Sequence, residues 1–169
     1  MRRFLEALYG STAALAAVFM IGLLVMVLLS IISRQLHFHV PGTDAYAGYL
    51  MAGSGFLALA HTLKRGEHIR VTLLLQYLGP RARHGMELWT LGLASLLAGL
   101  FAFYSVRLAW QSRLFNDIST SNDATPLWIP QLAMALGACV LLVACLDEWL
   151  LQWRGQRSSE APSEALRNE

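Results

Sequence analysis

The chain has 169 residues, of which 56% are apolar and 14% carry a charge, and its formal net charge is +2. Soluble domains have about 25% charged residues, and a chain of this length cannot bury so much apolar surface in water. The composition therefore excludes an ordinary soluble domain, and the small net charge gives no indication of nucleic-acid binding.

Four long runs without Asp, Glu, Lys or Arg predict membrane-spanning helices, at residues 11–33, 45–63, 88–106 and 127–146. Crossing about 30 Å of hydrocarbon takes about 20 mostly apolar residues in a helix. The runs are continuous and rich in Leu and Ala, whereas strands of a membrane barrel alternate in polarity. We therefore expect an all-α membrane protein with four transmembrane helices in residues 1–153, followed by a disordered cytoplasmic tail in residues 154–169.

Lys and Arg are distributed unequally between the two sides of these spans. The N-terminus, the middle loop and the tail together carry ten of them, and the other two loops carry three. Cytoplasmic flanks of membrane helices retain positive residues. Both termini are therefore expected in the cytoplasm.

The second span has marked ends. Thr43 is placed as its N-cap and Asp44 lies in its first turn, where a carboxylate favours the positive end of the helix dipole. Lys64, Arg65 and Gly66 follow at its C-terminal end, where basic residues and glycine are typical.

The middle loop predicts a short amphipathic helix over residues 67–78. Its polar residues His68, Thr72 and Gln76 recur every four positions, and the helix is too short to cross the membrane. Two placements are open: the helix lies flat on the inner leaflet, or it packs under the bundle as a connector.

The predicted spans lack the charged groups that ion-coupled pumps keep inside a helix bundle. Pro130 lies in the first turn of the fourth span, where proline is tolerated, so it does not break that helix. A transport site made by this chain alone is not expected, although backbone carbonyls stay possible ligands for Na⁺.

No cofactor or metal site is expected either. His61 is the one histidine within a span, and it lies near the cytoplasmic end, where hydrogen bonding is favoured over haem ligation. His37 and His39 are only a weak metal signal. Cys139 and Cys145 lie on different sides of one helix and cannot form a disulfide with each other.

Small residues recur at helical spacing and predict close helix contacts. Such contacts serve either packing within the chain or a partner-facing surface. The candidates for a partner interface are Ala45, Gly48, Ala52 and Gly55 in the second span, and Ser95 and Gly99 in the third. Ala94, Ala98 and Ala102 in the third span, and Ala133 and Gly137 in the fourth, have similar spacing.

Several stretches resemble the small membrane subunit of TRAP transporters, the DctQ-like family. The most characteristic is Gly66-Glu67-His68-Ile69-Arg70-Val71, directly after the second span; the others are residues 33–35, 41–46, 119–120 and 127–130. The chain departs from the family pattern at two places. It has Thr43-Asp44 where the family tends to have paired acidic residues at the start of the second span, and Leu136-Gly137 where the family tends to have Pro-Gly in the middle of the fourth. The residues in the family motifs or at the membrane surface are Arg34, Asp44, Lys64, Arg65, Gly66, Glu67, His68, Arg70 and Pro130.

The resemblance implies a tripartite, ATP-independent uptake system in the bacterial inner membrane. A periplasmic binding protein would deliver an organic anion, such as a dicarboxylate or a sugar acid, to a large permease that uses a Na⁺ gradient. The small subunit would be the scaffold of that permease and not an enzyme. A stand-alone membrane assembly factor and a membrane-anchor subunit of a redox complex are the alternatives.

Overall fold

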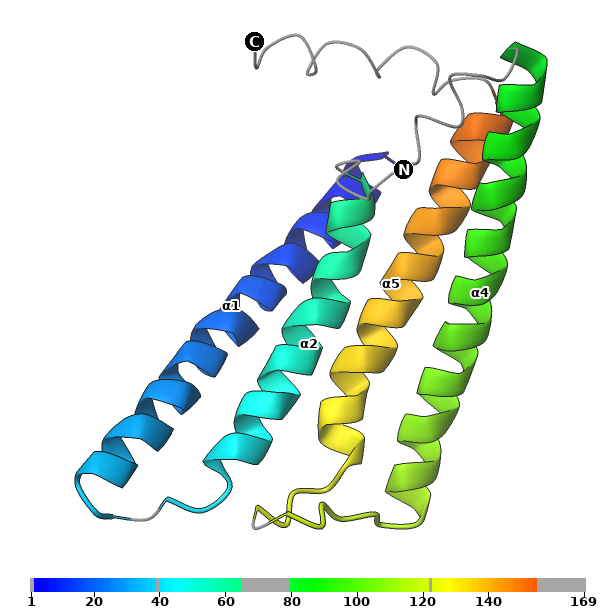
Figure 1. Cartoon of the computed structure of the whole chain (residues 1–169). Helices are drawn as coiled ribbons and strands as arrows, with labels where there is room; N and C mark the ends of the chain where they lie inside the picture. Colours follow the sequence, from blue (N-terminus) through cyan, green and yellow to red (C-terminus); the bar gives the residue numbers. More distant parts are fainter. Residues whose placement is uncertain (1, 39, 65–79, 122, 155–169) are drawn as a thin grey trace, which may run out of the picture.

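The computed structural model describes residues 2–38, 40–64, 80–121 and 123–154. These ranges contain four α-helices, α1 (Arg2–Gln35), α2 (Thr43–Lys64), α4 (Pro80–Leu114) and α5 (Trp128–Trp153), shown in Figure 1. The described residues form no strand, and Ile118 and Pro126 make an isolated antiparallel bridge. The expected all-α fold is confirmed for this part of the chain.

Three of the described helices are long and apolar enough to cross a membrane, over Leu5–Gln35, His84–Leu114 and Trp128–Trp153. α2 contains the expected span 45–63 but is not among these three helices. The fourth expected span begins at Leu127, one residue before α5.

The start of α2 differs by one residue from the expected cap. The backbone N–H of Tyr46 donates to the carbonyl oxygen of Gly42 at 3.0 Å, so Gly42 takes the N-cap position and Thr43 is the first helical residue. Gly42 has a φ of +82°, and a Cβ there would lie 2.8 Å from Cβ of Asp123. Both the conformation and the close approach require glycine.

The expected interfacial helix and the expected C-terminal tail fall largely outside the described residues. The helix of residues 67–78 lies wholly outside them, as do Arg65 and Gly66. Of the tail, only Arg154 is described.

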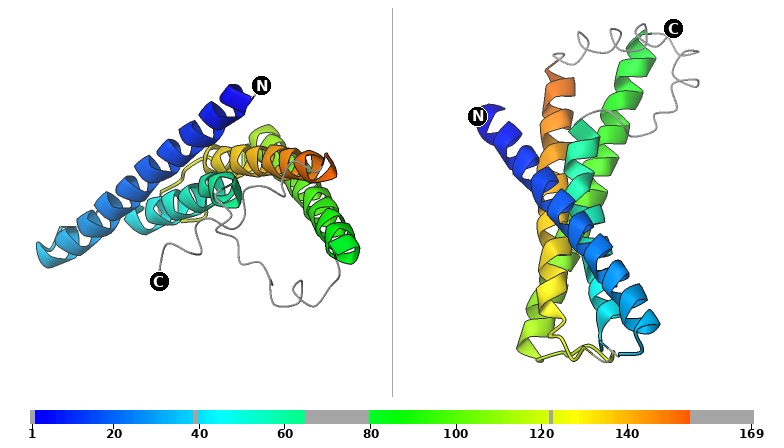
Figure 2. Two further views of the ribbon diagram at one scale, coloured as in Figure 1. Left: turned by 90° about the horizontal axis from the view of Figure 1, so that it is seen from above. Right: turned by 90° about the vertical axis from the view of Figure 1, so that its left-hand side faces the viewer.

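The helices form a row in the order α1, α2, α5, α4, and successive helices along the chain run in opposite directions (Figures 1 and 2). α1 crosses the others obliquely (Figure 2). The protein is therefore two helical hairpins, α1–α2 and α4–α5, which meet mainly where α2 packs against α5.

Small residues allow α2 and α5 to approach closely. A Cβ on Gly137 would lie 2.5 Å from the carbonyl oxygen of Phe56, so the α5 backbone directly contacts the α2 backbone. A Cβ on Gly53 would lie 2.6 Å from the Phe19 ring and 3.3 Å from Cβ of Ala133. Helices in lipid associate through such tight packing, because the lipid supplies no hydrophobic drive for them to associate.

Candidate functional site

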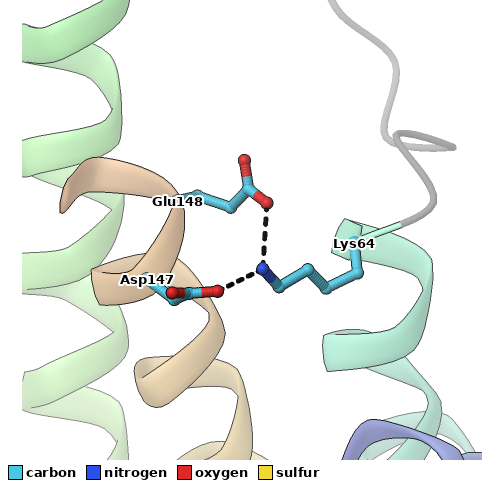
Figure 3. Close-up of polar contacts among 3 residues, drawn as sticks. All are labelled: Lys64, Asp147 and Glu148. Carbon is cyan, nitrogen blue, oxygen red and sulfur yellow. Dashed lines mark hydrogen bonds and ion pairs between the residues drawn. The ribbon is translucent and has the colours of Figure 1, made fainter. Parts of the chain in front are cut away.

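An ion-pair cluster joins the C-terminal end of α2 to the C-terminal part of α5 (Figure 3). Lys64, the last residue of α2, forms ion pairs with Asp147 and with Glu148, and its Nζ lies 3.3 Å from Oε1 of Glu148. The same Nζ lies 5.4 Å from the ring centroid of Tyr9, which adds a cation–π contact to α1. Three helices therefore meet at one cation.

The charge of Lys64 is preserved in this cluster. Burial alone would lower the pKa of Lys64, but its hydrogen bond to Asp147 and the negative charges of Glu148 and Asp147 outweigh that effect. The pKa is therefore raised from its usual 10.5, and the side chain stays cationic near neutral pH.

A second polar contact at this end joins α5 to α4. Nε2 of the buried Gln152 donates to Oε2 of Glu87 at 2.6 Å and lies 3.4 Å from Nδ1 of His84. Together with the Lys64 cluster, this contact connects all four described helices at the end of the bundle where α2 ends and α4 begins.

The loop between α4 and α5 is attached to the start of α2 at the opposite end. The Tyr49 hydroxyl lies 3.0 Å from Oγ of Ser119 and 3.2 Å from Oδ2 of Asp123. Oγ1 of Thr125 and Oη of Tyr46 lie 3.0 Å apart, within hydrogen-bond distance. The seam between α2 and α5 is therefore closed by polar contacts at both of its ends.

Asp123 makes this attachment dependent on pH. Desolvation would raise its pKa, but hydrogen bonds from Thr125, Ser119, its own backbone N–H and Tyr49 hold the pKa below the usual 3.8. The ionised carboxylate therefore stabilises the loop above pH 3.8, and this stabilisation is lost as the pH falls through the lowered folded-state value.

We expect the loop between α4 and α5 to keep its hydrogen-exchange protection near neutral pH and to lose it only below pH 3.8. Amide exchange, corrected for its intrinsic pH dependence, measures this. Asp123→Asn is expected to remove much of the protection at neutral pH and to abolish its acid dependence. Equal protection in Asp123→Asn and the unchanged protein at neutral pH would show that the carboxylate does not hold the loop.

The candidate interface residues fall into two groups. On α2, Gly48, Ala52 and Gly55 are exposed, and a Cβ added to Gly48 or Gly55 would have no atom within 4 Å. On α4, Ser95 is buried, and a Cβ on Gly99 would lie 3.6 Å from Leu142 of α5. Gly99 therefore packs within the chain, whereas the α2 residues lie on a face that the described helices leave open.

The surface and motif residues lie at the helix ends. Arg34 is in the last turn of α1, Asp44 is in the first turn of α2, and both are exposed. Pro130 lies in the first turn of α5, as expected. Arg65, Gly66, Glu67, His68 and Arg70 lie outside the described residues.

Sequence reasoning missed the ion-pair cluster. Asp147 and Glu148 were expected to follow the fourth span, but α5 continues to Trp153 and holds them in regular helix. A signal was present, because Lys64 and this acidic pair follow two spans that end on the same expected side of the membrane.

The described residues define an α-helical membrane protein: three of its helices can cross a bilayer, and the ion pairs found among these residues join Lys64, the last residue of α2, to Asp147 and Glu148 of α5. A family profile described as "Tripartite ATP-independent periplasmic transporters, DctQ component" matches residues 23–155. The chain therefore belongs to the DctQ family of TRAP transporter components, which is a transporter family and not an enzyme family. Among the curated proteins, none matches this chain.

Proposed function

We propose that this chain is the small membrane subunit that scaffolds the large permease of a TRAP transporter during Na⁺-coupled uptake of an organic anion, such as a dicarboxylate or a sugar acid. The DctQ match carries this proposal, since the family operates with a large permease and a substrate-binding protein. The closely packed seam between α2 and α5 supports it, because a scaffold has to keep its shape while its partner moves.

The proposed topology has four transmembrane helices, with both termini in the cytoplasm of a bacterium and the chain in its inner membrane. α1 ends at one end of the helix bundle and α4 begins at the opposite end, along the helix axes (Figure 1). α2 therefore carries the chain back across the same thickness of membrane that α1 crosses. The excess of Lys and Arg at the N-terminus, the middle loop and the tail supports this orientation. We place residues 67–78 on the cytoplasmic side as an interfacial helix.

The open face of α2 is the proposed contact with the large permease. Its small residues, Ala45, Gly48, Ala52 and Gly55, recur at steps of three and four, and the last three are exposed. Small residues permit close approach of a second helix, whereas a helix face in contact only with lipid has no need of them. The exposed row therefore supports the proposed interface on α2.

Gly48→Leu combined with Gly55→Leu is expected to reduce co-purification of the large permease by about tenfold, corresponding to about 1.4 kcal/mol of lost interface energy. A Cβ at either position would have no atom within 4 Å, so the fold of this chain is expected to survive. Affinity purification of a tagged small subunit, followed by quantification of the large permease, measures the loss.

The matched control is Gly10→Leu with Gly85→Leu, because these glycines also have no atom within 4 Å of an added Cβ but lie on α1 and α4. The control is expected to leave co-purification unchanged. If both double variants retain the large permease equally well, this α2 face is not the interface.

A further inference from the structure

Both connections at one end of the bundle, α1 to α2 and α4 to α5, expose large apolar side chains. Leu36 and Phe38 follow the end of α1 and are 66% and 46% exposed. Phe115 and Ile118 follow the end of α4 and are 70% and 57% exposed. α1 and α4 are the outermost helices of the row (Figures 1 and 2), so the two apolar pairs belong to opposite edges of the molecule.

The two outermost helices end in the same way. At the end of α1, the backbone N–H of Phe38 donates to the carbonyl oxygen of Ser33 at 3.1 Å, directly after His37 with a φ of +56°. At the end of α4, the N–H of Asp117 donates to the carbonyl oxygen of Ser112 at 2.9 Å, again directly after a residue with positive φ. This motif bonds carbonyl oxygens of the last helical turn within the chain. Backbone groups that are bonded in this way tolerate contact with lipid.

Two tyrosines of α2 indicate the level of these connections relative to the membrane. The hydroxyl oxygens of Tyr49 and Tyr46 lie 3.0 Å from Oγ of Ser119 and Oγ1 of Thr125, respectively, in the loop between α4 and α5. The close approach of Gly42 to the same loop holds the other connection at this level. Tyrosine is enriched where membrane and water meet, which indicates that both connections lie level with the lipid headgroups.

Lipid suits this pair of apolar edges better than one protein partner does. The segments of α1 and α4 that can cross a membrane end at Gln35 and Leu114, so Leu36 and Phe115 directly continue the surface that faces lipid. Lipid surrounds the bundle and reaches both edges, whereas a partner docked on one face of the row covers one edge. Exposed apolar side chains at such a boundary are typical of membrane contact.

We propose that both connections insert their apolar side chains into the boundary between headgroups and acyl chains of the adjacent leaflet. Leu36 and Phe38 anchor one edge of the row, and Phe115 and Ile118 anchor the other. The two anchors fix the depth of the bundle in the membrane and resist its rocking about an axis in the membrane plane.

Depth measurements on the spin-labelled full-length chain test the proposal, in vesicles of phosphatidylethanolamine and phosphatidylglycerol. Labels are attached through Phe38→Cys or Ile118→Cys, in a background without the native cysteines, Cys139→Ala with Cys145→Ala. Oxygen partitions into acyl chains and a nickel chelate stays in water, so the ratio of their effects on a label reports its depth. We expect both labels to lie about 5–10 Å inside the phosphate plane.

Two reference labels set the scale of depth. Val25→Cys is an exposed position within the membrane segment of α1 and is expected to give the deepest label. Ser121→Cys is an exposed polar position in the loop between α4 and α5, and its label is expected at or outside the phosphate plane.

A pair of charged variants tests the anchor on α4. Phe115→Asp with Ile118→Asp is expected to move a label at Leu114→Cys toward water by about 5 Å, or one helical turn, because carboxylates are costly among acyl chains. The matched control is Thr120→Asp with Ser121→Asp, which adds the same charge at exposed polar positions of the same loop. The control is expected to leave the depth of the label unchanged.

The proposal would be overturned if the labels at positions 38 and 118 were as accessible to the chelate as the label at position 121. Equal shifts from the two aspartate pairs would also overturn it. So would a loss of access for both oxygen and chelate after the large permease is added to the vesicles, since protein would then cover these side chains. Circular dichroism of each variant verifies that the fold is intact.

Discussion

Gly137→Ala is expected to lower the stability of the membrane domain, although alanine is the better helix former. The added Cβ would lie 2.5 Å from the carbonyl oxygen and 2.6 Å from the carbonyl carbon of Phe56, and backbone atoms cannot rotate away as a side chain can. Overpacking costs about 1–3 kcal/mol, which exceeds the gain of about 0.5–1 kcal/mol from replacing a helical glycine. We expect a net loss of about 1–2 kcal/mol, measured by unfolding in mixed detergent micelles.

Gly48→Ala is the matched control for Gly137→Ala. It makes the same chemical change in the interior of a helix, but its Cβ would have no atom within 4 Å. We expect unchanged or slightly increased stability, by up to about 1 kcal/mol. If the two variants unfold alike, the close α2–α5 contact does not contribute to the stability of the protein.

Lys64→Met is expected to produce the largest loss of stability among the variants considered. It leaves the carboxylates of Asp147 and Glu148 close together without their cation, and Glu148 is only 8% exposed. Breaking a buried ion pair from one side costs about 3–5 kcal/mol; since Lys64 and Asp147 are partly exposed, we expect about 2–4 kcal/mol. Unfolding in mixed micelles again provides the measurement.

Two further variants separate the charge of Lys64 from its packing. Lys64→Arg keeps the cation and is expected to retain most of the stability. Lys64→Met combined with Asp147→Asn and Glu148→Gln removes all three charges and is expected to recover a large part of the loss, because the two carboxylates no longer lie side by side without the charge of Lys64 between them. A triple variant less stable than Lys64→Met alone would contradict this explanation.

The helices and the ends of α2 could be predicted from the sequence, but the full lengths of α1, α4 and α5 could not. A run without charged residues marks only the part of a helix that lies in the hydrocarbon of the membrane. The helix itself continues beyond that run as long as its backbone hydrogen bonds are formed. α5 therefore continues past the expected end at residue 146 and through Asp147 and Glu148.

The order of the helices in the row could not be predicted. α2 carries small residues on several sides: Gly53 faces Phe19 and Ala133, whereas Gly48 and Gly55 face open space. Spacing alone does not distinguish a glycine that another helix covers from one that is left open. The expected packing role of Gly137 fits the structure, but its contact with the Phe56 backbone required the structure.

The contacts that close the seam at its ends were beyond sequence reasoning for a different reason. Tyr49 and Asp123 are 74 positions apart, and Lys64 and Asp147 are 83 apart. Their residue types suggest a membrane boundary but not a particular partner. Only the arrangement of the two hairpins brings these side chains together.

Uptake into vesicles tests the proposed scaffold role most directly. Vesicles would contain this chain alone, the large permease alone or both, and would be supplied with the binding protein, a labelled organic anion and an inward Na⁺ gradient. We expect accumulation only where both membrane subunits are present. Accumulation in vesicles that contain this chain alone would contradict the scaffold role, and so would full uptake by the large permease without it.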